Sequence, residues 1–150
     1  MRRWMYCDVN NVASVGLLAV RLMMGAAFIL HGWPKIQNPM GWLPATNPTP
    51  AVFQALAAVA EFGGGIALIL GLLTRVAAAG LAITMAVAMF TFHFPQNHPF
   101  VTMDGPSWEL AGIYFACSIM LLFSGPGRFS LDALLFGNPR DGAAARTPLP

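Results

Sequence analysis

Two residues of opposite charge lie deep inside long apolar stretches of the sequence. Arg21 falls in the middle of residues 12–33, and Glu61 falls in the middle of residues 51–73. A charged side chain in hydrocarbon costs roughly 2.5–3.5 kcal/mol on insertion scales, so such residues are kept when they are paired or used in function. Adjacent antiparallel helices would bring the two together, and we therefore predict an Arg21–Glu61 ion pair.

This pair has two interpretations. A structural ion pair would fix how the first two helices dock. A functional pair would place a proton-accepting carboxylate, or a polar contact for a ligand, inside the protein. On the second interpretation Glu61 and Arg21 are the candidate catalytic residues, with Glu61 exchanging a proton and Arg21 holding its charge.

A run of glycines, Gly63 to Gly65, follows Glu61 closely. Small residues allow membrane helices to approach each other, which is one explanation of the run. The other is that the missing side chains leave space for a flat ligand, such as a quinone ring, beside Glu61. Gly64 and Gly65 are therefore candidate ligand-binding residues.

Three histidines and a carboxylate gather at the predicted outer end of the helices. His31 closes the first apolar stretch and His93 the third, His98 lies in the loop that follows, and Glu109 begins the fourth stretch. Imidazole and carboxylate groups together suit a transition-metal site or a proton relay to a bound quinol, and they also serve as polar anchors at a membrane surface. Their spacing is not a recognised metal motif, so we assign no metal ligand.

The elements that must position these residues are membrane helices. Of the 150 residues 57% are hydrophobic and 9% are charged, which excludes an ordinary soluble domain, where about 25% are charged. Only helices satisfy their own backbone within a single span. The prediction is an all-α, polytopic four-helix bundle with spans at Val12–Trp33, Ala51–Leu73, Val76–Phe94 and Ser107–Phe123, and a tight turn at Thr74 and Arg75.

The cations predict the orientation of the spans, because Lys and Arg favour cytoplasmic loops. If the spans alternate, one side holds Arg2, Arg3, Arg75, Arg128, Arg140 and Arg146, and the other holds Lys35. Both termini should then be cytoplasmic. Residues 1–11 form the N-terminus and 12–136 the membrane domain, including a short interfacial helix at 129–136 capped by Ser130, and 137–150 form a flexible tail.

A cleaved signal peptide is the alternative for the first stretch, because Arg2 and Arg3 precede it. The stretch is long, contains Arg21 and is followed by three more apolar segments. We therefore expect an uncleaved first span.

The order of these signals along residues 15–132 carries a family resemblance. It consists of Arg21, Gly25, Phe28, His31, Gly32 and Lys35, then Glu61, Gly64 and Gly65, then Leu70, Gly71, Leu72, Thr74 and Arg75, then His93 and Glu109, and finally Gly125, Pro126, Gly127, Ser130, Leu131 and Asp132. This pattern resembles the DoxX family of small, multi-pass proteins of the bacterial inner membrane.

The resemblance implies a four-helix inner-membrane protein. Founding members of the family are associated with thiosulfate:quinone oxidoreductase, and others join redox or detoxification assemblies. The family pattern also falls on Lys35 and Arg75. It makes Lys35 a candidate ligand-binding residue together with His31, His93, Glu109, Gly64 and Gly65.

The leading functional hypothesis is a membrane subunit of a quinone-linked oxidoreductase or redox-detoxification system. The sequence shows no haem, flavin or nucleotide motif, so an enzymatic role would be that of a subunit, with quinone as the expected ligand. The alternative is a non-catalytic membrane protein that stabilises or recruits another complex, supported by the aromatic and proline-rich loop around Trp42. A small transporter comes third and would need a dimer.

The expected partners follow from the same features. They are the lipid bilayer, a membrane or periplasmic protein, and a second copy of the chain. The net charge of +2 implies no nucleic-acid partner.

Overall fold

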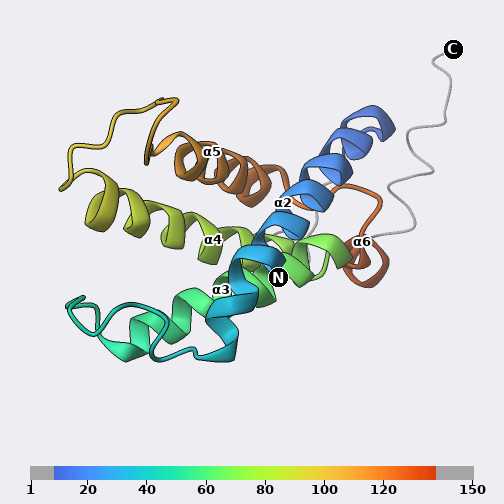
Figure 1. Ribbon diagram of the computed structural model, residues 1–150. Helices are drawn as coiled ribbons and strands as arrows, with labels where there is room; N and C mark the ends of the chain where they lie inside the picture. Colours follow the sequence, from blue (N-terminus) through green and yellow to red (C-terminus); the bar gives the residue numbers. More distant parts are fainter. Residues whose placement is uncertain (1–8, 138–150) are drawn as a thin grey trace, which may run out of the picture.

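The computed structural model describes residues 9–137, and these form helices, turns and loops without a β-strand. The helices are α2 (Asn11–Gln37), α3 (Ala51–Leu70), α4 (Thr74–Ala88), the π-helical segment η1 (Met89–His93), α5 (Glu109–Ser124) and α6 (Leu131–Phe136), as shown in Figure 1. The all-α prediction is confirmed for these residues. The predicted cytoplasmic ends, with Arg2, Arg3, Arg140 and Arg146, lie outside the described residues, apart from 9–11 and Gly137.

Three helical stretches of the described chain are long and apolar enough to cross a membrane: Asn11–Gln37, Ala51–Leu70 and Thr74–His93. The apolar helix α5 is shorter, with 16 residues that span about 24 Å, against a hydrocarbon thickness of about 30 Å. The fourth span and the orientation of the termini therefore stay predictions.

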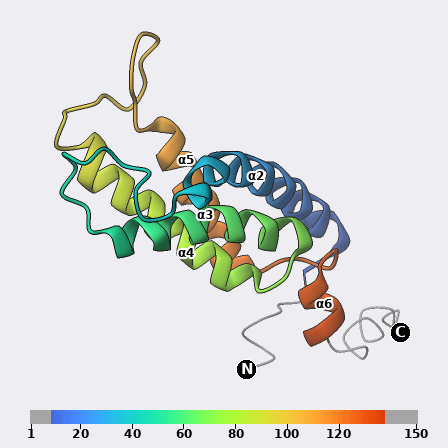
Figure 2. The ribbon, with the colours of Figure 1, turned by 60° about the horizontal axis from the view of Figure 1, so that its bottom comes forward.

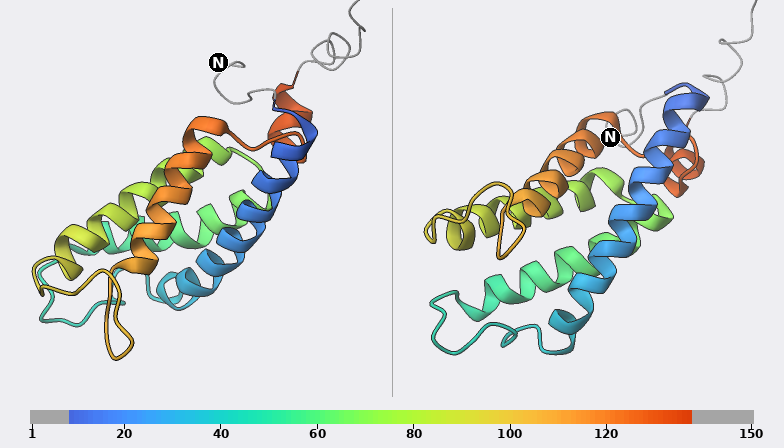
Figure 3. Two further views of the ribbon diagram at one scale, coloured as in Figure 1. Left: turned by 90° about the horizontal axis from the view of Figure 1, so that it is seen from above. Right: turned by 45° about the horizontal axis from the view of Figure 1, so that its top comes forward.

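The helices pack in the order in which they occur along the chain. Helix α2 packs against α3, α3 against α4, and α4 against α5, whereas α2 and α5 meet only sparingly. Figures 2 and 3 show the two connecting loops, 38–50 and 94–108, at one end of the bundle and α6 at the other. We call these the loop end and the α6 end.

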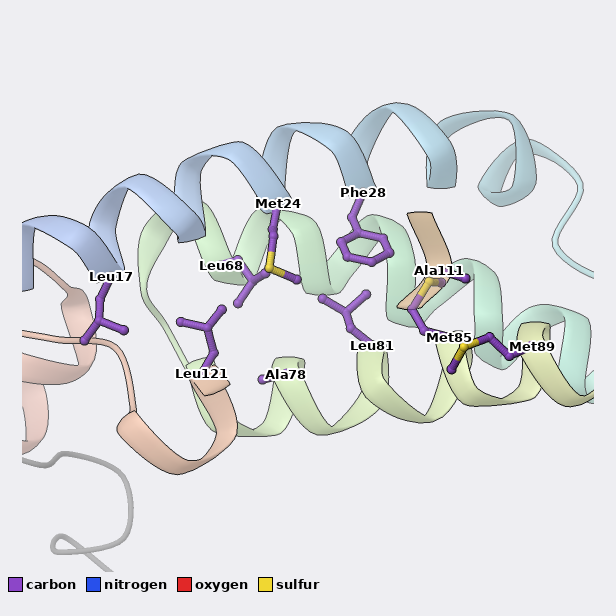
Figure 4. Close-up of a cluster of buried hydrophobic side chains, with 10 residues drawn as sticks. All are labelled: Leu17, Met24, Phe28, Leu68, Ala78, Leu81, Met85, Met89, Ala111 and Leu121. Atoms are coloured by element: carbon purple, nitrogen blue, oxygen red, sulfur yellow. The ribbon is translucent and has the colours of Figure 1, made fainter. Parts of the chain in front are cut away.

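The apolar core is a thin layer between the helices. In Figure 4 the side chains of α2 and α3 point toward those of α4 and α5. The cluster consists of Leu17, Met24, Phe28, Leu68, Ala78, Leu81, Met85, Met89, Ala111 and Leu121. Because the outward faces of the same helices carry exposed residues such as Met23, Val59 and Ile83, the molecule is apolar both inside and outside, as expected for contact with lipid.

Glycines let α2 and α3 approach closely. A Cβ atom on Gly65 would lie 2.8 Å from the carbonyl oxygen of Gly25, and one on Gly25 would lie 2.7 Å from that of Gly65. A Cβ on Gly64 would meet the side chain of Leu81 at 3.3 Å. These contacts support the close-packing interpretation of the glycines. The role of Gly64 and Gly65 as ligand-binding residues stays a prediction.

Two helix boundaries differ from the predicted ones. Helix α2 does not end at Trp33 but continues through Pro34 to Gln37, which brings Lys35 onto the helix. Thr74 and Arg75 do not form the turn but begin α4, and the chain turns at residues 71–73, where Gly71 and Leu73 have φ angles of 65° and 49°. Both boundaries coincide with contacts between helices: Lys35 pairs with Glu61 of α3, and Asp132 of α6 accepts hydrogen bonds from the amides of Leu73 and Thr74.

The short helix after the fourth apolar segment is confirmed. It begins at Leu131, and the hydroxyl oxygen of Ser130 accepts a hydrogen bond of 3.1 Å from the amide of Ala133, as predicted for its cap.

Candidate functional site

Glu61 forms an ion pair with Lys35. The Nζ atom of Lys35 lies 2.6 Å from each carboxylate oxygen of Glu61. The side chain of Glu61 is 4% exposed and that of Lys35 is 23% exposed. Lys35 lies in the last turn of α2, and Glu61 lies in the middle of α3. The ion pair therefore links the two helices toward the loop end.

Trp42 covers this ion pair. The Nζ atom of Lys35 lies 4.6 Å from the centroid of the Trp42 ring, a cation–π contact. The indole Nε1 of Trp42 donates a 3.0 Å hydrogen bond to the carbonyl oxygen of Gln54, which fixes the position of the ring. The loop 38–50 therefore folds back over the pair.

Gln54 fastens the same loop and was missed by the sequence analysis. Its side chain is buried, its Oε1 accepts a 3.1 Å hydrogen bond from the amide of Leu43, and its Nε2 donates one of 3.0 Å to the carbonyl of Thr49. Gln54 lies two helical turns before Glu61, on the same face of an otherwise apolar helix. That spacing was the signal that could have identified it.

The predicted Arg21–Glu61 pair does not form. Arg21 is 1% exposed and donates hydrogen bonds to four backbone carbonyls, those of Leu68 (2.9 Å), Ile69 (3.2 Å), Pro126 (2.8 Å) and Phe129 (2.8 Å). The first two carbonyls belong to the last turn of α3, where carbonyls lack their usual helical partners. Arg21 thus caps the end of α3 and holds the segment that leads to α6.

The register of the α2–α3 hairpin explains this error. Gly25 packs against Gly65, so Arg21, one turn earlier in α2, is level with the end of α3 and not with its middle. Further along the same helix pair, Gly32 contacts Phe62, so Lys35, three residues after Gly32, is within reach of Glu61. The sequence does not reveal this register, because the ends of two apolar stretches do not show which residues of the helices lie opposite each other.

Asp132 completes the polar cluster at the α6 end. Its carboxylate is fully buried and accepts hydrogen bonds from the amides of Leu73 (2.8 Å) and Thr74 (2.9 Å). These amides belong to the start of α4, which has no cap of its own, so Asp132 supplies one from a distant part of the chain. We call Arg21, Asp132 and the groups that they bind the clasp.

Arg75, the other arginine on the family pattern, lies at the same end. It is buried, and its Nη2 donates a 3.0 Å hydrogen bond to the carbonyl of Phe123. Like Arg21, it contacts the backbone of a neighbouring helix.

The predicted histidine and glutamate group is only partly assembled. His93 and His98 meet, with their Nδ1 atoms 3.1 Å apart. His31 is exposed and lies edge-on to Tyr114 of α5, with ring centroids 6.4 Å apart, and Glu109 is half-buried in the first turn of α5. Within residues 9–137 no three metal-ligating side chains form a group.

These features define a class of protein. Three spanning helices of the described chain, exposed apolar outer faces and buried charges satisfied by other polar groups are the properties of a multi-pass membrane protein. The sequence pattern of the DoxX family matches residues 16–94, more than half of the chain. The protein belongs to the DoxX family and is a multi-pass protein of the inner membrane, as the resemblance implied.

Relatives from several bacteria cover most of the chain. The inner membrane protein YqjF of Escherichia coli K12 is 31% identical over 85% of this chain and 97% of its own length. An uncharacterized membrane protein of Mycobacterium tuberculosis is 33% identical over 79% of this chain and 80% of its own length. The Bacillus subtilis protein named "Putative oxidoreductase CatD" is 26% identical over 89% and 97%. No solved structure matches the chain.

Proposed function

We propose that this protein is the membrane subunit of a quinone-linked oxidoreductase or redox-detoxification system, and that the Lys35–Glu61 ion pair contacts the quinone head group. In this proposal α5 is the fourth span and both termini are cytoplasmic, so the ion pair lies in the outer half of the bilayer. The name of the relative CatD, which describes an oxidoreductase, supports the same class of activity.

The buried ion pair carries this proposal. Removing an ion pair from water is costly, and a well-packed apolar pair of the same size is often at least as stable. Stability alone therefore gives little reason to keep Lys35 and Glu61 in an apolar hairpin. A reaction that moves protons does, because an ammonium group donates to a quinone carbonyl and a carboxylate accepts the proton of a quinol hydroxyl.

The remaining residues divide between binding and structure. Trp42, fixed by Gln54, offers an aromatic face beside Lys35, and the partly exposed Lys35 side chain marks the side from which a ligand approaches. Arg21 takes no part in this step, because four carbonyls use its guanidinium. The electrons pass to or from a redox centre on a partner protein.

A binding experiment tests the proposal. A short-chain ubiquinol and a short-chain menaquinol, the reduced forms whose hydroxyl groups donate to Glu61, are titrated without oxygen into the protein in lipid nanodiscs, and each affinity is measured by calorimetry. We expect Glu61→Gln to weaken binding about tenfold, which corresponds to about 1.4 kcal/mol for a charge-assisted hydrogen bond. The control, Asp104→Asn, makes the same chemical change in an exposed loop and should bind like the original protein.

Equal quinol affinity in Glu61→Gln and the original protein would contradict the proposal. Thermal melts of each variant in the same nanodiscs show whether a loss of binding reflects a loss of fold.

A second candidate function, the non-catalytic partner role, is favoured by a different surface. The loop 94–108 exposes apolar side chains at the loop end: Phe100 (51% exposed), Val101 (52%) and Met103 (93%). Exposed apolar side chains of this kind favour protein contacts. Trp42 gives less support to this role than expected, because its ring lies over Lys35. Co-purification of a stoichiometric partner without quinone would favour this role.

A further inference from the structure

His93 and His98 form a close pair of imidazoles at the loop end. Their Nδ1 atoms are 3.1 Å apart, and both side chains are half-buried. Within residues 9–137 this contact is the only hydrogen bond that either ring makes. Both Nε2 atoms therefore lack a partner in the described chain.

The backbone turns back on itself to bring the two rings together. In η1 the amide of Phe94 bonds to the carbonyl of Met89, five residues earlier, at 2.9 Å, and the amide of His98 bonds in the same way to the carbonyl of His93 at 3.1 Å. Asn97 adopts a left-handed conformation with a φ angle of 55°. Wide turns of the π type are rare and are frequent at functional sites. A left-handed Asn also carries a conformational cost that another contact must offset.

Phe92 holds the two rings in place. Its ring packs edge-on against His93 and His98, with centroid distances of 5.1 Å and 5.5 Å. An aromatic wall of this kind limits rotation of the imidazoles. The two Nδ1 atoms therefore stay close to each other.

We propose that His93 and His98 form a two-histidine chelate for a divalent transition-metal ion, with Cu²⁺ bound most strongly. Metal–nitrogen bonds of about 2.0–2.1 Å place two nitrogens roughly 2.9–3.4 Å apart at bond angles of about 90–110°. The observed distance of 3.1 Å lies within this range. Copper leads the series of divalent ions for imidazole ligands.

Binding needs a change of tautomer and a turn of the rings, because in the free pair the two Nδ1 atoms point at each other along the hydrogen bond. In the free pair one Nδ1 carries the proton of the hydrogen bond and the other accepts it. When that proton moves to the Nε2 atom of the same ring, both Nδ1 atoms present a lone pair to the metal. Two ligands from residues 9–137 leave the other coordination positions to water, so the ion exchanges readily. Acid should weaken binding, because protonated imidazole is no longer a ligand.

This site is separate from the proposed quinone site. The histidine pair belongs to η1 and the turn that follows it, whereas Lys35 and Glu61 belong to α2 and α3. Either proposal can fail without the other.

Copper titration of the tag-free protein in nanodiscs tests the inference. Calorimetry should show one Cu²⁺ bound per chain, more tightly than Zn²⁺ or Ni²⁺, and electron paramagnetic resonance should show coupling to two imidazole nitrogens. We expect His98→Gln and His93→Gln each to weaken Cu²⁺ binding at least tenfold. His31→Gln, which changes the third histidine, should leave it unchanged. Quinone affinity, measured on the same samples, should not change in His98→Gln.

The inference is overturned if Cu²⁺ binds the His93→Gln/His98→Gln double variant as tightly as the original protein, because the ion would then be held elsewhere. A resonance spectrum without imidazole nitrogens, or no copper binding by the original protein, would also overturn it. Thermal melts of the variants confirm that each is folded.

Discussion

Arg21 and Glu61 satisfy their charges in different ways. Arg21 donates to four backbone carbonyls, whereas Glu61 is paired with Lys35. The guanidinium is therefore a structural cap, and the carboxylate is the charged group with a partly exposed partner. The residue types were enough to single out both positions in the sequence. The partners were not predictable, because they depend on the register of two helices and on a segment more than 100 residues away.

Replacement of Arg21 by Lys tests the structural role. An ammonium group has three donors and no planar fork, so it cannot reach all four carbonyls. We expect Arg21→Lys to destabilise the protein by about 2–3 kcal/mol, measured by unfolding in mixed micelles. Arg128→Lys, which alters an arginine bonded to the exposed side chain of Asn11, should cost less than about 0.5 kcal/mol. Equal effects of the two changes would contradict the clasp.

Single and double substitutions test how the Lys35–Glu61 pair contributes to stability. Lys35→Met leaves a buried carboxylate without its partner and should cost up to about 3 kcal/mol in the same assay. The double variant Lys35→Met/Glu61→Leu removes both charges and should recover most of that loss. Additive losses in the double variant would show that the two residues contribute to stability separately.

The apolar pattern of the sequence indicates where the helices lie, whereas contacts with other parts of the chain determine where they begin and end. Helix α2 passes through Pro34 although proline usually interrupts a helix, and this last turn carries Lys35 to Glu61. The start of α4 is capped by Asp132, which follows it by 58 residues. Local sequence predicted the long helices within a few residues. It contained no sign of these caps or of η1.

Substitutions of two glycines in α3 test the close approach of α2 and α3. A methyl group on Gly65 would contact the backbone of α2, so Gly65→Ala should separate α2 from α3 and destabilise the protein by about 2 kcal/mol or more. Gly63 is exposed with open space around its Cβ position, so Gly63→Ala should be neutral or stabilise the helix by up to about 1 kcal/mol. Thermal melts of the Gly65→Ala and Gly63→Ala variants compare the two positions directly. A milder effect at Gly65 than at Gly63 would rule out the close approach.

At the scale of the molecule, polar groups gather at the two ends and the middle is apolar. The clasp closes the α6 end, and the Lys35–Glu61 pair, Trp42 and the histidine pair lie toward the loop end. Composition was sufficient to predict a membrane protein, but the predicted Arg21–Glu61 pair placed the two charges together and not toward opposite ends. The distribution of arginines predicts, in addition, that the loop end faces outward from the cytoplasm.

Cysteine labelling tests that orientation. In a Cys7→Ser/Cys117→Ser background, a cysteine introduced by Asp104→Cys lies in the exposed loop 94–108 and should react with an impermeant maleimide added to the periplasmic side. A cysteine introduced by Leu134→Cys, exposed on α6, should react only after the inner membrane is opened. The opposite labelling pattern would show that the loop end faces the cytoplasm.

The most direct test of the central claim is photoaffinity labelling with an azido-quinone in nanodiscs, followed by peptide mapping. We predict that the label attaches to the segments around Lys35, Trp42 and Glu61, and that excess unlabelled quinone removes it. Labelling confined to α4 and α5, or labelling that excess quinone does not reduce, would contradict the claim that the Lys35–Glu61 pair forms the quinone site.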